Sequence, residues 1–156
     1  MVASEIERKF LVPAVPSSLE LGSGSRLRQG YLAIDGPVEV RVRRSGDASV
    51  LTIKAGSGLA RTEVERDLTE AEADELWPAT EGRRVEKVRF SLPLPTGDVI
   101  EVDVYEGALD GLVTAEVEFA NGEAATAFDA PDWCARELTG DAAWSNAVLA
   151  VEGRPS

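Results

Sequence analysis

The sequence predicts a mainly β (α+β) protein, in which a closed eight-stranded antiparallel barrel carries a few helices packed outside. Three observations predict this fold. Apolar and polar residues alternate with period two through most of the chain, short glycine-containing turns separate the alternating segments, and the polar side of nearly every segment is ionic. At 156 residues the chain fits one domain, which we expect to span residues 1–156.

Eight segments show the period-two alternation that is typical of strands. They cover residues 3–12, 26–34, 38–44, 49–54, 61–68, 83–92, 98–105 and 112–119. Turn signals such as Asp35-Gly36-Pro37 lie between them, and short connections of this kind favour antiparallel neighbours.

Few helices are predicted. Residues 69–72 form a capping-box pattern that begins a helix, and Pro78 must end it. Residues 141–151 carry Ala, Trp and Leu at helical spacing and predict a second helix near the C-terminus. A shorter helical turn is expected at Ser17. The stretch 121–136 has little periodicity and is expected to be a surface excursion.

The composition excludes several classes of function. A formal charge of −12 argues against nonspecific binding to nucleic acid or to an anionic membrane surface. The absence of histidine excludes a Ser-His-Asp triad and histidine metal sites, so any metal would be oxygen-ligated, such as Mg²⁺, Mn²⁺ or Ca²⁺. The one cysteine, Cys134, and an N-terminus without an apolar signal region lead us to expect a cytoplasmic protein.

The ionic side of the strands predicts a polar interior. Charged residues that alternate along one strand normally face solvent, but here nearly every strand has the pattern, and the few helices cannot cover the apolar face of an open sheet. A barrel with an ionic interior accounts for both faces, and such an interior implies a ligand or water-filled space. The residues on this side are Glu5, Glu7, Lys9, Arg41, Arg43, Lys54, Arg61, Glu63, Glu65, Lys87, Arg89, Glu101, Asp103, Glu116 and Glu118.

The mixture of acids and bases predicts what this space holds. Two carboxylates about 4 Å apart repel by roughly 4 kcal/mol at an effective dielectric constant near 20, so acid pairs such as Glu116 and Glu118 need neutralisation. Divalent cations choose carboxylate ligands, and guanidinium groups match phosphate bidentately. Acids for a metal together with bases for phosphate predict a polyphosphate–metal site.

The ordered motifs resemble those of the CYTH superfamily, also called triphosphate tunnel metalloenzymes. Glu5-x-Glu7-x-Lys9 is similar to the family's ExExK signature, which alone is a weak signal. The match continues in order through Gln29-Gly30-Tyr31-Leu32, Arg41-x-Arg43, Leu51-Thr52-Ile53-Lys54, Arg61-x-Glu63-x-Glu65, Lys87-x-Arg89, Glu101-x-Asp103-x-Tyr105, Gly111-Leu112, Ala115-Glu116-Val117-Glu118-Phe119 and Trp144-Ser145-Asn146-Ala147. The resemblance covers about residues 3 to 150, and the full set is highly specific.

The resemblance implies an eight-stranded tunnel, a small-molecule triphosphate substrate, and Mg²⁺ or Mn²⁺. The implied metal ligands are Glu5, Glu7, Asp103, Glu116 and Glu118, with Glu63 or Glu65 assisting them. As a hypothesis of mechanism, a second metal or the catalytic carboxylates Glu63 or Glu65 would position and deprotonate the attacking water. The implied substrate-binding residues are Lys9, Arg41, Arg43, Lys54, Arg61, Lys87 and Arg89. In the same hypothesis of mechanism, Lys54 helps the leaving oxygen by its charge or by donating a proton. Trp144 departs from the family pattern, which usually has Tyr there, and no helical phosphate-binding domain is expected after the tunnel.

The implied activity is that of a hydrolase, most directly an inorganic triphosphatase that cleaves tripolyphosphate to pyrophosphate and phosphate. The same tunnel could instead run class IV adenylate cyclase chemistry or hydrolyse thiamine or nucleoside triphosphates, although the motif strands carry no evident aromatic clamp for an organic group. A non-catalytic polyphosphate- or nucleotide-binding module and a partner-binding scaffold are the remaining alternatives. Outward apolar patches on a barrel could also pair two copies as a homodimer.

Overall fold

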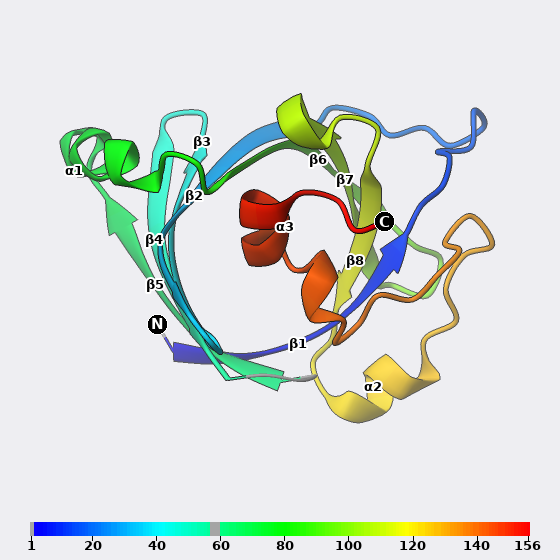
Figure 1. Ribbon diagram of the computed structural model, residues 1–156. Helices are drawn as coiled ribbons and strands as arrows, with labels where there is room; N and C mark the ends of the chain where they lie inside the picture. The colour runs from blue at the N-terminus through cyan, green and yellow to red at the C-terminus, as the bar shows by residue number, and fades with distance from the viewer. Residues whose placement is uncertain (1, 57–59) are drawn as a thin grey trace.

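The computed structural model describes residues 2–56 and 60–156, and for residues 2–5 and 60 it describes the backbone alone. Eight antiparallel strands form a closed barrel in the order β1-β5-β4-β3-β2-β6-β7-β8 (Figure 1). The strands are β1 (Val2–Leu11), β2 (Ser25–Asp35), β3 (Val38–Ser45), β4 (Ala48–Ala55), β5 (Ala60–Leu68), β6 (Arg84–Pro93), β7 (Val99–Glu106) and β8 (Val113–Glu118). The predicted closed antiparallel barrel and all eight predicted strands are confirmed.

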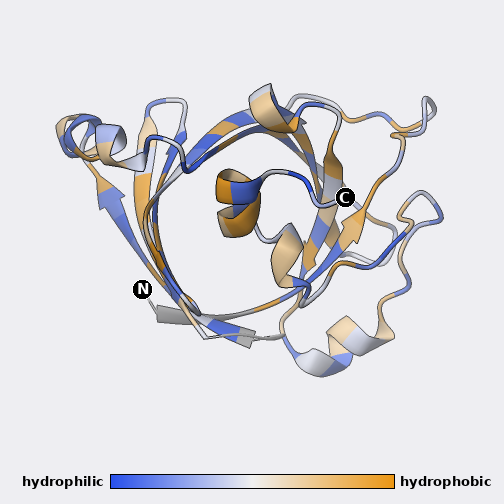
Figure 2. Ribbon diagram, in the orientation of Figure 1, coloured by the Kyte–Doolittle hydropathy of each residue, from blue (hydrophilic) through white to orange (hydrophobic). Residues whose placement is uncertain are grey.

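The first strand closes the barrel because it pairs with a different neighbour along each half. Val2 lies opposite Val64 of β5, whereas Glu7 lies opposite Glu118 of β8. The hairpin turns match the sequence signals: Gly36 adopts a φ of 55°, in the left-handed region that such tight turns require and that glycine tolerates best. Along the strands, hydrophilic and hydrophobic residues alternate, so the two faces of the barrel differ in character (Figure 2).

Helices cover the outer face in two places. Helix α1 (Glu70–Leu76) begins at the predicted capping box and continues into the 3₁₀ turn η1 (Trp77–Thr80), and together they pack Ala73 and Trp77 against Val42 of β3. Helix α2 (Gly122–Ala127) packs Ala125 in a cluster with outward residues of β1, β7 and β8. A further 3₁₀ turn, η2 (Gly107–Leu109), follows β7.

The end of the chain differs from the prediction that the helices lie outside. The 3₁₀ turn η3 (Ala142–Trp144) and helix α3 (Asn146–Glu152) lie within the ring of strands (Figure 1). Trp144 and Leu149 are buried there in one cluster with Val85 and Tyr105. Val85 and Tyr105 have the same strand parity as the inward charged residues, so part of the interior is apolar and needs an apolar partner. The last helix supplies it.

Three further local predictions need correction. The predicted helix over residues 141–151 is interrupted at Ser145, whose extended backbone (ψ 147°) ends η3 and whose Oγ accepts from the Val148 N–H at the start of α3. Ser17 lies in a turn closed by the Leu19 N–H to Pro16 carbonyl bond, not in a helix. The stretch 121–136 contains α2, which begins because the Asn121 side chain accepts from the Ala124 N–H.

None of the helices in the described part of the chain is long and apolar enough to cross a membrane.

Candidate active site

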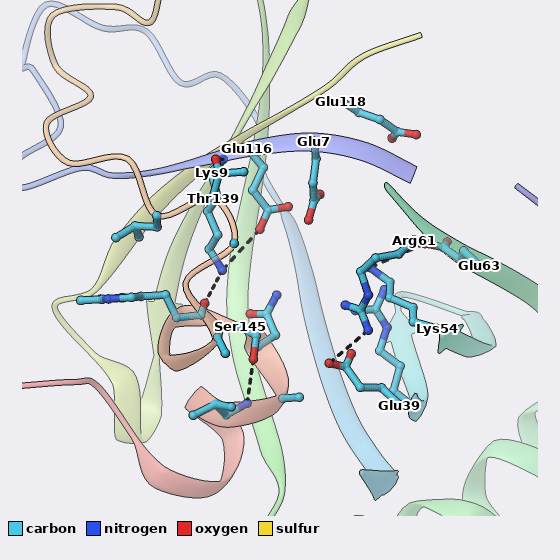
Figure 3. Close-up of a pocket in the computed structure, with 18 of the residues that line it drawn as sticks. Glu7, Lys9, Glu39, Lys54, Arg61, Glu63, Glu116, Glu118, Thr139 and Ser145 are labelled. Carbon is cyan, nitrogen blue, oxygen red and sulfur yellow. Dashed lines mark hydrogen bonds and ion pairs between the residues drawn. The ribbon is translucent and has the colours of Figure 1, made fainter. Parts of the chain in front are cut away.

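A cavity of about 840 Å³ lies inside the barrel, and its walls are the ionic faces of the strands (Figure 3). Period-two alternation places these side chains together because every second residue of a strand points inward. Of the residues proposed from the sequence, the cavity wall contains Glu7, Lys9, Arg41, Arg43, Lys54, Arg61, Glu63, Glu65, Arg89, Glu116 and Glu118. Glu101 also lines the cavity. The side chain of Glu5 lies outside the described residues.

One wall combines β1 and β8. Lys9 lies opposite Glu116 in the strand register, and its Nζ is 3.7 Å from Glu116 Oε1. The same ammonium donates to the main-chain carbonyl of Trp144 at 2.6 Å. Burial alone would raise the pKa of Glu116, but the charges of Lys9 and Arg89 outweigh burial and hold that pKa far below its usual range. These neighbouring charges therefore favour the carboxylate form of Glu116.

The same wall carries two carboxylates that face one another. Glu7 of β1 and Glu118 of β8 are directly opposite in the register, a placement in which like charges destabilise a sheet. No group of three potential ligands among the described side chains is arranged to hold a metal ion. Mg²⁺, however, commonly binds through one or two carboxylates and keeps several water ligands, which substrate phosphate oxygens can replace, so Glu7 and Glu118 fit a metal of this kind.

The facing wall comes from β3, β4 and β5 (Figure 3). Lys54 Nζ lies 3.6 Å from Glu63 Oε2, and both side chains are largely buried. Arg61 lies 3.4 Å from Glu39 Oε1 and also donates through Nε to the Gly56 carbonyl at 3.1 Å. Glu39 was not predicted as a site residue. Its position two residues before Arg41 on the same strand face was the signal that could have found it.

Two arginine side chains on β3 bring positive charge to this part of the cavity. Arg41 is buried, and Arg43 Nε donates to Gln29 Oε1 at 3.2 Å. Burial, together with the nearby charges of Arg41 and Arg89, lowers the pKa of Arg43 to about 10. Clustered like charges of this kind favour a bound anion, because an anion relieves their mutual repulsion.

Two predicted residues are buried deeper than the cavity wall. Lys87 and Asp103 are both fully buried, and Lys87 Nζ donates to Asp103 Oδ2 at 2.7 Å. Burial lowers the pKa of Lys87 to about 8, against the opposing effect of Asp103. Arg89, which does reach the cavity, contacts both oxygens of the same carboxylate at 2.7 Å.

The C-terminal segment supplies cavity residues that the sequence did not predict. Thr139, Ser145 and Asn146 line the cavity, and Tyr105 Oη donates to Asn146 Oδ1 at 2.7 Å. The stretch around Trp144 matched a family motif, but helical spacing alone gives no sign that a helix will enter a barrel.

No protein-family model matches the chain. It is 45% identical over 149 residues to an inorganic triphosphatase from Nitrosomonas europaea, which covers 95% of this chain and 97% of that protein. An inorganic triphosphatase from Acetivibrio thermocellus is 37% identical over 150 residues, 95% of this chain and 94% of the relative.

Solved structures of similar proteins have the same fold. A crystal structure of an inorganic triphosphatase superimposes with a TM-score of 0.71 at 41% identity, covering 97% of each chain. A Bacillus halodurans protein named as a candidate adenylate cyclase shares the fold at a TM-score of 0.62, with 17% identity over 80% of this chain and 85% of its own. Identity to two relatives along nearly the whole chain, together with the ionic tunnel, shows that this chain belongs to the inorganic triphosphatase family.

Proposed function

We propose that this chain hydrolyses inorganic tripolyphosphate to pyrophosphate and phosphate, with Mg²⁺ or Mn²⁺ as cofactor. The observation that carries the proposal is the meeting of acids and bases from opposite walls in one cavity. A site that only bound an anion would need the bases alone, whereas phosphoryl transfer needs bases for the substrate and carboxylates for a metal and for water. The names of both close relatives agree with this reading.

In this proposal the substrate oxygens bind to the basic side chains of the cavity. Arg41, Arg43 and Arg89 reach it from β3 and β6, and their guanidinium groups suit phosphate oxygens. Such contacts hold the chain of three phosphates in line and neutralise charge that the transition state redistributes. For a loose, highly charged transition state, most of the rate comes from this positioning and charge stabilisation.

Glu63 and Lys54 are the proposed acid–base residues. The Glu63 carboxylate, or Glu65 beside it on the same strand face, orients the attacking water and accepts its proton. Lys54, whose Nζ lies 3.6 Å from Glu63, stabilises the pyrophosphate oxygen that leaves.

Glu7, Glu116 and Glu118 are the proposed metal-holding residues. Glu5 is added because Glu5-x-Glu7-x-Lys9 resembles the ExExK signature of triphosphate tunnel metalloenzymes. When bound, the divalent ion supplies charge neutralisation to the phosphate oxygens. Glu116 has a further effect without any metal, because it holds Lys9 and Arg89 on this wall.

Phosphate release measured with malachite green tests the proposal. Tripolyphosphate should be hydrolysed with a kcat/KM at least tenfold above the values for ATP and thiamine triphosphate, and chromatography should detect no cyclic AMP. Cyclic AMP formation would favour a cyclase, and tight binding of tripolyphosphate without phosphate release would favour a binding module.

Substitution of the metal-holding residues gives a second test. The double variant Glu116→Gln/Glu118→Gln should lose most hydrolysis with either Mg²⁺ or Mn²⁺. Glu123→Gln, in α2 on the outside of the barrel, is the matched control and should leave the rate unchanged. Undiminished hydrolysis by the double variant would contradict the metal assignment.

A further inference from the structure

Asp103 sits at the centre of a buried charge cluster beneath the cavity wall. Its side chain is fully buried, and it is absent from the described residues that line the cavity. In the strand register, Asp103 of β7 lies directly opposite Arg89 of β6, and Lys87 points inward two residues before Arg89.

Both oxygens of this carboxylate are already in use. Oδ1 accepts from Arg89 Nε at 2.7 Å, while Oδ2 accepts from Arg89 Nη2 and from Lys87 Nζ, each at 2.7 Å. A carboxylate has about four acceptor positions, and three of them are filled here by charged donors. The position that is left, on Oδ1, lies beside Arg89, so a divalent cation bound to Asp103 would have to lie close to these cations or displace one of them. The surroundings of Asp103 therefore suit a base-holding role, not metal ligation.

Arg89 is the member of the cluster that reaches the cavity. Its side chain is 18% exposed, and its other contacts are Glu101 at 2.6 Å and Glu116 at 3.5 Å. The fork formed with Asp103 fixes the plane of the guanidinium group, which a flexible arginine would otherwise have to order when the substrate binds.

Lys87 balances the charge of Asp103. Asp103 and Lys87 together carry no net charge, so Asp103 can hold Arg89 without cancelling its charge. At the cavity, Arg89 also contacts Glu101 and Glu116. Burial alone would raise the pKa of Asp103, but Lys87 and the Arg89 hydrogen bonds outweigh burial and hold the pKa below its usual range. The carboxylate stays charged and can hold both bases.

We propose that Asp103 is a positioning residue that fixes Arg89 for the triphosphate, with Lys87 as its counter-charge, and that it is not a ligand of the divalent metal. The part about triphosphate rests on the proposed function. The part about the metal stands on the contacts of Asp103 alone.

Metal binding in the absence of hydrolysis tests whether Asp103 is a ligand of the divalent metal. Mn²⁺ binding to the substrate-free protein, measured by electron paramagnetic resonance of the free ion, should have a Kd in Asp103→Asn within about twofold of the wild-type value. Glu118→Gln, a substitution at a cavity carboxylate, is the matched comparison and should raise that Kd about tenfold. A rise in Asp103→Asn as large as that in Glu118→Gln would overturn the proposal.

The order of the Arg89 side chain tests whether Asp103 fixes Arg89 for the triphosphate. In a side-chain ¹H–¹⁵N spectrum, the Arg89 Nε–H signal should be protected from solvent exchange in the wild type and lose that protection in Asp103→Asn. With tripolyphosphate at saturating Mg²⁺, the same variant should show a KM at least tenfold higher, whereas the Mg²⁺ concentration for half-maximal activity should not change. An Arg89 signal that stays protected, with an unchanged KM, would overturn the proposal.

Asp103→Asn leaves Lys87 buried without its carboxylate and could unfold. Lys87→Met/Asp103→Asn removes both charges and should keep the wild-type circular dichroism spectrum and Mn²⁺ affinity, yet still bind tripolyphosphate at least tenfold more weakly. Wild-type affinity for tripolyphosphate in this double variant would overturn the positioning role. A wild-type protein that hydrolyses no triphosphate would instead contradict the proposed function, and the Mn²⁺ and Arg89 measurements would still decide the role of Asp103.

Discussion

The Lys9 ammonium donates to the main-chain carbonyl of Trp144 at 2.6 Å inside the barrel. The main chain of Lys9 also bonds to the C-terminal segment. Its N–H donates to Thr139 Oγ1 at 3.0 Å, and its carbonyl accepts from the Leu138 N–H at 2.7 Å. Lys9 thus joins the strand with the ExExK motif to the C-terminal segment, and one residue serves both the cavity and the segment that fills part of the barrel.

Lys9→Met should loosen the C-terminal segment. Because the buried Trp144 carbonyl loses a charged donor, we expect the free energy of unfolding to fall by about 1–3 kcal/mol in urea titrations. The loss should be local as well, so that hydrogen exchange at the Leu149 and Gly153 amides of α3 becomes faster.

Lys54→Met is the matched control for Lys9→Met. Lys54 is as buried as Lys9, and it lies beside Glu63 of β5 instead of Trp144. Exchange at the α3 amides should remain at the wild-type rate in this control. Equal acceleration in both variants would mean that general destabilisation, and not the contact with Trp144, explains the effect.

The facing carboxylates Glu7 and Glu118 should act together on the metal. Either Glu7→Gln or Glu118→Gln is expected to raise the Mg²⁺ concentration for half-maximal hydrolysis about tenfold, which corresponds to about 1.4 kcal/mol. Residues that share one ligand couple, so the double variant should lose less than the sum of the two. Mg²⁺ titration at constant tripolyphosphate measures this, and additive losses would indicate two separate metal sites.

Most of the barrel was predictable because strand parity is a local property. Residues such as Arg41 and Arg43 share a face whatever the strand pairs with, so the sequence alone placed them inside once a barrel was assumed. The capping box at Thr69 is equally local, since the donors and acceptors lie within four residues.

Depth within the barrel and the course of the last helix were not predictable. Parity puts Asp103 and Glu101 on the same inner face, but only the packing of β6 against β7 buries Asp103 fully and leaves Glu101 at the cavity. Similarly, the spacing around Trp144 predicts an apolar helix face, which could pack on either side of the barrel wall. Which side it covers depends on distant residues such as Val85 and Tyr105.

The stability of the protein should depend on pH through Lys87. Burial lowers its pKa to about 8, whereas an unfolded lysine titrates near 10.5. Between these values the unfolded chain binds more protons than the folded chain, so the contribution of this group to stability rises with pH. Urea unfolding at pH 7.5 and pH 9.5 should show the wild type gaining about 2 kcal/mol relative to Lys87→Met. A relative loss would mean that the Lys87 pKa is raised instead.

Gly30 of β2 lies against Thr80 of η1, one residue before Tyr31 in the cavity wall. A Cβ atom at Gly30 would lie within 2.8 Å of three side-chain atoms of Thr80. Thr80 cannot easily move, because its Oγ1 donates to the Trp77 carbonyl at 2.7 Å and accepts from Arg84 Nε at 2.9 Å. We therefore expect Gly30→Ala to lower the free energy of unfolding by about 1–3 kcal/mol in urea titrations, through overpacking.

Gly122→Ala separates this steric effect from the general effect of replacing glycine. A Cβ at Gly122 would meet nothing within 4 Å, and the residue begins helix α2, where alanine is the better helix former. The control should therefore be neutral or stabilising by up to about 1 kcal/mol. Gly30→Ala should also reduce kcat/KM for tripolyphosphate, since displacement of β2 moves Tyr31, whereas Gly122→Ala should not. Equal stability of the two variants would show that β2 and η1 can separate without cost.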